Sequence, residues 1–358
     1  MLLKRKEKTI EEKVFTKQMS INSIVMTKGI IEIPSGYTTM EDEFAMVFDW
    51  CEEDYFMHPF RELVIPETIR IMPPIWVTAS SPEESHAEIF KTITVHPDNP
   101  YYCSEDGVLF TKDKKTLVCY PCGKEGESYT IPEGVTNIGE AAFVNNVYLK
   151  KVVIPQSVIR IEKQAFFQMQ TIREIHVPET VTYIGEECFD LCVSLNRIEL
   201  PEHLEVLYSS IFSSGVAVLV PDHVDNIRTD YIRTTWQKVP YMNPMILTKN
   251  NPKVTAFAEE NEYAHYEGVY TGPDGIIWSG DKKTLLCFPA TWENDTYELP
   301  KEAREIYRYA FYKSDIKSVT SEEKVTLVGE AWPARRNEVT VKGTRFKVTD
   351  KGFLKKEA

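Results

Sequence analysis

The chain has 358 residues, a net charge of −13 and 42% hydrophobic residues, including 18 Tyr, 17 Phe and 6 Trp. This acidity argues against a nucleic-acid-binding protein, which needs a basic surface, and against binding to an anionic membrane surface. The apolar content is sufficient for a large buried core, and no apolar run is long enough to cross a bilayer.

Residues 1–20 form a charged N-terminal arm, for which we expect a frayed or helical tail, with a basic docking site as the alternative. The arm has no apolar run typical of a signal peptide. Seven cysteines show no paired spacing, which favours reduced thiols in a cytoplasmic protein. The alternative localisation is the cell surface or secretion, by a chain whose export signal was removed.

From residue 21 a degenerate form of the repeat begins, in which the segment IEIP ends at Pro34 and the segment LVIP ends at Pro66. Terminal repeats of a stacked array are atypical because they cap the core, so we expect capping repeats here. The interval between Pro97 and Pro132 is then longer than any interval between the regular repeats that follow it. The extra length predicts a β-hairpin insertion at 106–121, which protrudes from the stack.

Four regular segments follow, and their prolines recur at one constant spacing: Pro132, Pro155, Pro178 and Pro201. A fixed period of about 23 residues is the signature of a stacked repeat. The residues before each proline alternate as a half-buried strand does, and the proline ends the strand because it cannot donate to the sheet. A phenylalanine recurs at one position after each proline, and we expect these side chains to stack as a structural core: Phe143, Phe166, Phe189 and Phe212, with Phe311 in a later copy.

The frame L-x-x-I-x-I-P-x-x-V-x-x-I-G-x-x-A-F resembles the BspA-type leucine-rich repeat, a bacterial and protist variant. Ile138-Gly139, Ala142-Phe143 and Ile184-Gly185 match its most specific positions. The resemblance covers about residues 95–230 and recurs over about 268–320. It implies a curved β-rich leucine-rich-repeat solenoid with β-hairpin insertions and little regular helix, used for binding. It implies no catalytic residues.

The frame fades over 233–262, which we interpret as an irregular connector, and returns in a second, shorter module over 263–345. Equivalent residues of the two modules differ in residue number by one constant amount, which we call the module offset. It relates Asp106 to Asp274 and Cys119 to Cys287, so a second hairpin is expected at 274–289. The first module then spans 21–232. Residues 346–358 are a C-terminal tail, and we expect one or two closing strands just before it or at its start. We expect one continuous solenoid.

Two clusters could carry metal or redox chemistry, and for both the structural interpretation is preferred. Cys119 and Cys122 form a C-x-x-C motif, but no helix follows it and the second module has Ala290 in place of the second cysteine. His203 and His223 follow repeat prolines and could stack beside Glu202 and Asp222 as metal ligands, although acidic residues are ordinary there. We therefore expect no metal, no cofactor and no catalytic residue.

The outward positions of the strands before the prolines are the predicted partner-binding surface: Lys151, Val153, Glu174, His176, Arg197 and Glu199, followed by Ala217 and Leu219. Arg197 is the expected hot spot. The sequence predicts a non-enzymatic binding module, an interaction protein whose partner is another protein. The alternative is an exported, adhesin-like surface protein that recognises a host protein or a glycan. Neither nucleic acid nor membrane insertion is expected.

Overall fold

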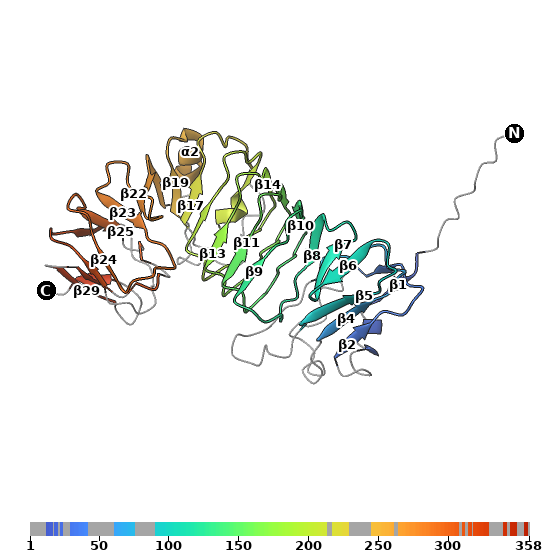
Figure 1. Cartoon of the computed structure of the whole chain (residues 1–358). Coiled ribbons are helices and arrows are strands. Elements are labelled where there is room, and N and C mark those ends of the chain that lie inside the picture. The colour runs from blue at the N-terminus through green and yellow to red at the C-terminus, as the bar shows by residue number, and fades with distance from the viewer. Residues whose placement is uncertain are drawn as a thin grey trace.

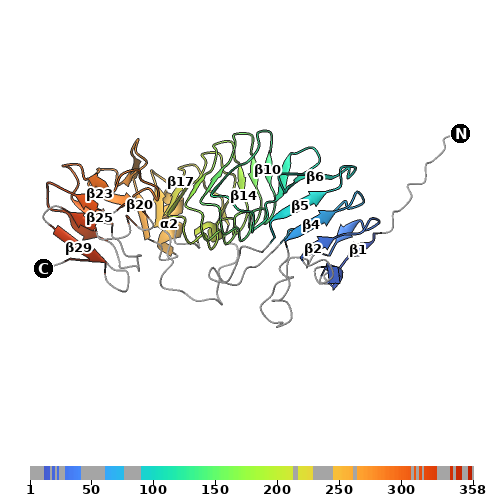
Figure 2. The ribbon, with the colours of Figure 1, turned by 60° about the horizontal axis from the view of Figure 1, so that its bottom comes forward.

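The structure is a computed structural model of the chain. It describes residues 12–16, 18–20, 22–23, 29–41, 61–75, 90–212, 217–228, 245–260, 264–307, 310–311, 314–316, 318–328, 339–341, 344–348 and 354–356. Within these ranges the chain forms a β-solenoid, as the sequence predicted. It is an elongated arch along which the strands follow one another in chain order, from β1 near the N-terminus to β29 near the C-terminus (Figure 1). The same order along the long axis is seen after a 60° turn (Figure 2).

One row of parallel strands, which we call the pre-proline row, contains the strands that precede the repeat prolines and the strands that continue the same stack. Hydrogen bonds divide it into separate sheets, with a break between β13 and β15. Its members are β2 (Ile30–Glu32), β4 (Glu62–Ile65) and β5 (Thr92–Val95); β9 (Ser128–Thr130), β11 (Lys151–Val153) and β13 (Glu174–His176); β15 (Arg197–Glu199), β17 (Ala217–Val220), β19 (Met245–Thr248) and β20 (Ala264–Glu267); and β24 (Thr296–Glu298) with β26 (Ser318–Thr320).

The second row, the post-proline row, contains the strands on the opposite side of each turn of the solenoid, many of them only two residues long. Its members are β1 (Val14–Phe15) and β3 (Thr39–Met40); β6 (Tyr102–Glu105), β7 (Val108–Thr111), β8 (Thr116–Cys119), β10 (Asn137–Ile138), β12 (Arg160–Ile161) and β14 (Tyr183–Ile184); β16 (Leu207–Tyr208) and β18 (Ile227–Arg228); and β21 (Tyr270–Thr271), β22 (Ile277–Trp278), β23 (Thr284–Cys287), β25 (Glu305–Tyr307) and β27 (Thr326–Val328).

Strand register follows the repeat period of the sequence. Val152 on β11 pairs in parallel with Tyr129 on β9 and Ile175 on β13. Val152 is buried while Lys151 and Val153 are exposed, as alternation along a half-buried strand requires. The repeat frame therefore sets both the pairing and the buried side of the pre-proline row.

The predicted aromatic core is present as a stack. Phe143, Phe166 and Phe189 are fully buried, and the ring centroids of successive members lie 5.0 and 5.5 Å apart in near-parallel planes. Tyr120 extends the stack, with its ring centroid 5.2 Å from that of Phe143. Phe311 is buried in the second module, whereas the side chain of Phe212 lies outside the described part of the chain. One ring per turn thus fills the space that a single repeat could not enclose.

Both predicted hairpins are present, but they do not protrude. Strands β7 and β8 pair antiparallel, and so do β22 and β23, with equivalent irregularities at Leu109/Phe110 and Ile277/Trp278. Strand β8 also pairs in parallel with β10, so it is the post-proline strand of its own turn. The first hairpin is buried on both sides, because Phe110 belongs to the central core and Leu109 to the N-terminal core. It is a layer of the stack and not an appendage.

The turns that end the two hairpins are copies of one another in their hydrogen bonds. The hydroxyl of Thr111 donates to Asp113 Oδ1, and the hydroxyl of Ser279 donates to Asp281 Oδ1, each at 2.7 Å. Lys114 and Lys282 both have a positive φ, of 55° and 59°. The module offset therefore describes a repeated three-dimensional unit and not only a repeated pattern of letters.

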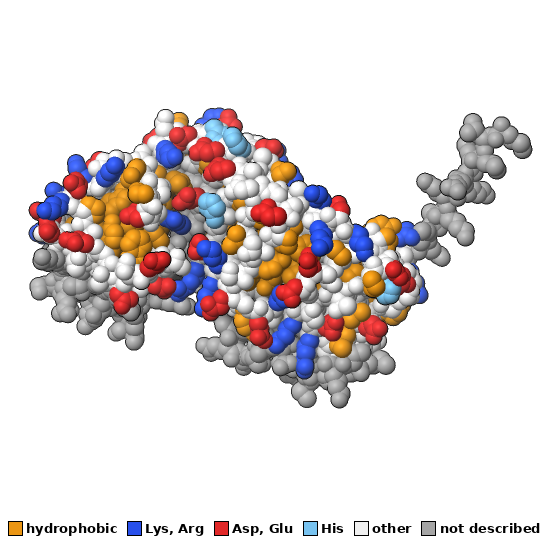
Figure 3. Space-filling view, in the orientation of Figure 1, with side chains coloured by type: hydrophobic (Ala, Val, Ile, Leu, Met, Phe, Trp, Pro, Cys, Tyr) orange, Lys and Arg blue, Asp and Glu red, His pale blue; other side chains and the backbone are white. Residues whose placement is uncertain are grey.

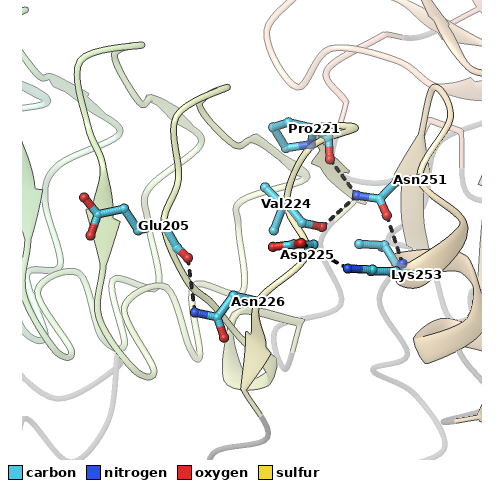
Figure 4. Close-up of polar contacts among 8 residues, drawn as sticks. Glu205, Pro221, Val224, Asp225, Asn226, Asn251 and Lys253 are labelled. Atoms are coloured by element: carbon cyan, nitrogen blue, oxygen red, sulfur yellow. Dashed lines mark hydrogen bonds and ion pairs between the residues drawn. The ribbon is translucent and has the colours of Figure 1, made fainter.

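Regular structure occupies residues 245–260, where an irregular connector was expected. Strand β19 continues the pre-proline row, and helix α2 (Pro252–Glu260) packs beside it. The buried Asn251 caps this helix, since its Oδ1 accepts a hydrogen bond from Val254 N at 3.1 Å. Its Nδ2 donates to the carbonyl oxygens of Pro221 and Val224 in the preceding turn (Figure 4). The helix start is thereby tied to the solenoid, while residues 229–244 lie outside the described part.

The ends of the chain carry small additional sheets. The predicted closing strands are present as β28 (Val339–Val341) and β29 (Thr344–Val348), which pair antiparallel, and β30 (Leu354–Lys356) adds to them. The arm over residues 1–11, including Lys4 to Lys8, lies outside the described part. No helix in the described ranges is long and apolar enough to cross a membrane.

Candidate functional site

A cleft of about 510 Å³ lies between the first module and the second, and we call it the inter-module cleft. One wall comes from strands β13 and β15 of the first module, at the point where the pre-proline row is broken. The other wall comes from the turn that leads into β22 and from the segment that follows β23. The lining residues are 173–177, 196, 197 and 199 on the first wall, and 271–275 with 289–293 on the second.

Four of the six residues predicted to bind a partner line the first wall: Glu174, His176, Arg197 and Glu199. The other two, Lys151 and Val153, lie on the neighbouring strand β11, outside the cleft and exposed. Lys151 Nζ reaches Glu174 Oε1 at 2.8 Å. Figure 3 shows charged side chains of both signs along the boundary between the second module and the middle of the molecule, beside a hydrophobic patch over the second module.

The open surface expected at Arg197 is in fact a junction between the modules. The Arg197 guanidinium donates to the carbonyl oxygen of Gly275 and its side chain is only 25% exposed. Beyond it, Ala217 is buried and Leu219 is half-buried against the core of the second module. The prediction that these positions point outward is wrong for Ala217, which the second module covers, whereas Arg197 and Leu219 are partly exposed. Binding by the six predicted residues itself stays a prediction.

Two further polar contacts fix the modules to each other at the cleft. Asn196 is buried, and its Nδ2 donates to the carbonyl oxygen of Phe288 at 2.9 Å. Arg173 pairs with the Asp315 carboxylate of the second module. A buried amide and two arginines therefore link the two walls of the cleft.

The shape of the second wall depends on the turn that leads into the hairpin, from β6 to β7 in the first module and from β21 to β22 in the second. This turn differs between the two modules. Strands β6 and β7 are joined by the two residues Asp106 and Gly107, both with positive φ, as in a tight type I′ turn. In the second module Thr271 pairs with Ile277, so five residues form the turn. Gly272 and Pro273 begin this longer loop, because proline cannot donate to the ladder. The loop lines the cleft and carries Asp274 into its wall.

The aromatic floor of the second wall is formed by Trp292, which packs against two further aromatic rings that do not line the cleft. The ring of Trp292 lies 4.8 Å from that of Phe288 and 5.6 Å from that of Tyr297, between centroids. Burial raises the pKa of Tyr297 to about 12, and the negative charge of Asp274 adds to this effect. Asp274 is therefore close to the aromatic group while remaining exposed itself. An aromatic surface beside an exposed carboxylate suits a polar or cationic ligand group.

The candidate metal and redox residues are placed apart from this cleft. Cys119 and Cys122 are buried and unpaired, and burial raises the pKa of the Cys122 thiol to about 12, so neither thiol is a ready nucleophile. His223 Nδ1 lies 3.2 Å from Glu202 Oε2, and the rings of His203 and His223 lie 6.3 Å apart. Across the described ranges no group of three or more His, Cys, Asp or Glu side chains could hold a metal ion.

The sequence interpretation missed the second wall of the cleft. A signal was present, because the module offset places Trp292 where the first module has Lys124. A lysine replaced by a tryptophan at equivalent positions of two related modules indicates a position with a different role. What the sequence could not indicate was that this position would lie opposite β13 and β15.

Comparison with known proteins places the repeats in a family. Residues 119–231 and 286–332 match the BspA type leucine-rich repeat region, in 6 copies. No curated protein matches the chain in sequence.

Solved structures similar to the chain include a leucine-rich repeat protein from Eubacterium ventriosum, at 19% identity and a TM-score of 0.40, covering 57% of this chain and 60% of that one. The pneumococcal vaccine antigen PcpA has 17% identity and a TM-score of 0.43, with 67% and 66% covered. A leucine rich cell surface protein from Faecalibacterium prausnitzii has 24% identity and a TM-score of 0.43, with 58% and 61% covered. The chain thus spans less than two thirds of the length of each of these three proteins. Residues 119–231 and 286–332 of this chain therefore match BspA-type leucine-rich repeats.

Proposed function

We propose that this chain is a non-enzymatic protein-binding module, and that its partner inserts a segment into the inter-module cleft. The observation that carries this proposal is the cleft itself, in which two modules contribute facing walls around about 510 Å³. A volume of this size is in the range that bound groups fill in proteins. Most of the predicted binding surface lies on its first wall, which joins the sequence argument to the geometry.

The polar groups around the cleft are arranged as a recognition site requires. Glu174, His176 and Asp274 come from both walls and converge on one space. Several convergent polar groups beside an apolar floor fix the orientation of a ligand, while the aromatic floor supplies contact area. The rest of the predicted surface, Lys151 and Val153, would then form a rim that the partner also covers.

Site-specific cross-linking tests this proposal. A photo-reactive amino acid is placed at the exposed cleft residue Thr291, and a control is placed at the exposed Ile159, next to β12 and outside the cleft. We expect a discrete cross-linked protein partner from Thr291 and none from Ile159. Equal labelling from both positions, or cross-linking to a glycan without protein, would reject the proposal.

Two substitutions by tryptophan then test whether the partner binds in the cleft or on the wider strand surface. His176→Trp narrows the cleft, whereas Val153→Trp adds the same side chain on β11, outside it. We expect His176→Trp to abolish the cross-link and Val153→Trp to leave it largely intact. The reverse result would place binding on the open strand surface and not in the cleft.

A further inference from the structure

In the first module, two carboxylates at the duplicated hairpin form ion pairs with lysines of the same chain. Asp106 Oδ2 lies 3.0 Å from Lys124 Nζ, and the Lys124 side chain is only 19% exposed. Glu125 Oε1 lies 3.0 Å from Lys91 Nζ. Both acidic residues of the first module therefore have a lysine from their own chain within ion-pair distance.

In the second module the same two carboxylates are kept but their lysines are not. The residues at the module offset are Asp274, Glu293 and, in place of Lys124, Trp292. All three line the inter-module cleft. Within the described ranges no Lys or Arg nitrogen lies at ion-pair distance from either carboxylate, and the contact found for Asp274 is from Ile276 N at 3.2 Å.

The cations that do line the cleft are used elsewhere. Arg173 pairs with Asp315, and Arg197 binds the Gly275 carbonyl oxygen and lies 3.7 Å from Glu199. His176 stands on the opposite wall, on β13. The second wall of the cleft thus presents two carboxylates and an indole without a built-in counter-charge.

We propose that a basic side chain of the protein partner, a lysine ammonium or an arginine guanidinium, pairs with Asp274 as Lys124 pairs with Asp106, in the part of the cleft that Glu293 and Trp292 also line. The inference rests on the proposed function and names the chemistry of the inserted segment. A cation at this place gains the attraction of two carboxylates and of the indole ring, and the cleft shields these contacts from solvent in part. The first module shows within this same chain that the position accepts an ammonium group.

Binding of defined peptides tests the inference. The probe is a fluorescent, end-capped tetralysine peptide, with tetraglutamate as the charge control and free spermine as the small cation. At low ionic strength we expect tetralysine to bind and tetraglutamate not to bind. Asp274→Asn and Glu293→Gln should each weaken tetralysine binding about five-fold, the effect of losing one partly shielded ion pair.

Matched variants separate the cleft from general acidity. Asp106→Asn with Glu125→Gln removes the same charge from the first module, where the carboxylates are paired, and should leave binding unchanged. Trp292→Lys installs the lysine of the first module and should reduce tetralysine binding at least about ten-fold, because the built-in cation then occupies the site. Thermal unfolding shows whether each variant folds, and Asp274→Asn stands in for Trp292→Lys if that variant does not.

The inference would be overturned by any of the following results. Equal loss from the Asp106/Glu125 variant would show non-specific attraction, and binding unaffected by Asp274→Asn would show the wrong site. Spermine binding that competes at the site and exceeds that of tetralysine would assign it to a free polyamine. A cross-linked partner that occupies the cleft through neutral or acidic residues would reject this inference while leaving the proposed function intact.

Discussion

The two hairpins of this protein begin from one pattern and end in different environments. In the first module, Asp106 and Gly107 make a two-residue turn that packs against β5, and Lys124 forms an ion pair with Asp106. In the second module the five-residue turn approaches Arg197 of the first module, and the tryptophan that replaces the lysine lines an open cleft. One repeated unit can therefore serve as an internal layer of a stack or as the wall of a site. Which role it takes depends on the turn and on one or two side chains.

The aromatic stack gives the largest expected difference between the modules. Phe166 is fully buried between Phe143 and Phe189, whereas Phe311 is 5% exposed with Phe288 at 5.0 Å on one side. Phe166→Ala should cost about 3–5 kcal/mol of unfolding free energy because it leaves a closed cavity. Phe311→Ala should cost less. Denaturant unfolding measures both, and a loss below about 1 kcal/mol at Phe166 would contradict the stacked core.

The hairpin glycines give the next largest effect. Gly107 and Gly275 have φ of 74° and 75°, a conformation that alanine adopts only with strain. A Cβ at Gly107 would also lie 2.5 Å from Thr92 Oγ1, whereas at Gly275 the nearest atom is the end of the flexible Arg197 side chain, at 3.0 Å. We expect about 2 kcal/mol lost for Gly107→Ala and about 1 kcal/mol for Gly275→Ala. Equal losses would show that φ alone sets the cost.

Alkaline pH should weaken the first module through a thiol that the second module lacks. Burial raises the pKa of Cys122 to about 12 from a model-compound value of 9.0, and Ala290 stands at the equivalent position. The folded chain holds this proton more tightly than the unfolded chain, so the stabilisation is complete below pH 9 and is lost as the pH rises towards 12. At about pH 10 the loss should be about 1 kcal/mol.

Unfolding measured at neutral pH and near pH 10, with and without Cys122→Ala, tests this expectation. The variant should show a smaller loss of stability between the two pH values than the parent chain. Ala290→Cys is the matched variant in the second module, where Ala290 is also buried. An unchanged pH dependence in Cys122→Ala would show that its thiol does not contribute.

The smallest effects separate the junction from the open surface. Arg197→Ala removes the hydrogen bond to the Gly275 carbonyl oxygen and should cost about 1 kcal/mol. Lys151→Ala removes an exposed pair with Glu174 and should cost about 0.5 kcal/mol or less. Hydrogen exchange in β23 should rise for Arg197→Ala only. If both variants behave alike, Arg197 does not hold the second module in place.

The sequence by itself determined the solenoid, its register and its aromatic stack. These features join residues at a constant separation, as in the parallel pairing of Lys151 with Glu174 in the next repeat, so a periodic pattern encodes them directly. The second hairpin was predictable for the same reason, because the module offset is constant along the copied segment.

Only the tertiary structure decided the cleft and helix α2. The contacts of Arg197 with Gly275 and of Arg173 with Asp315 span 78 and 142 residues, and neither separation belongs to a repeat period. Between the two modules lie β19, which continues the row after β17, and α2, whose capping residue Asn251 is hydrogen-bonded to the preceding turn. A repeat pattern specifies neighbours along the stack, whereas the docking of one module on another depends on the shape of both surfaces once they are folded.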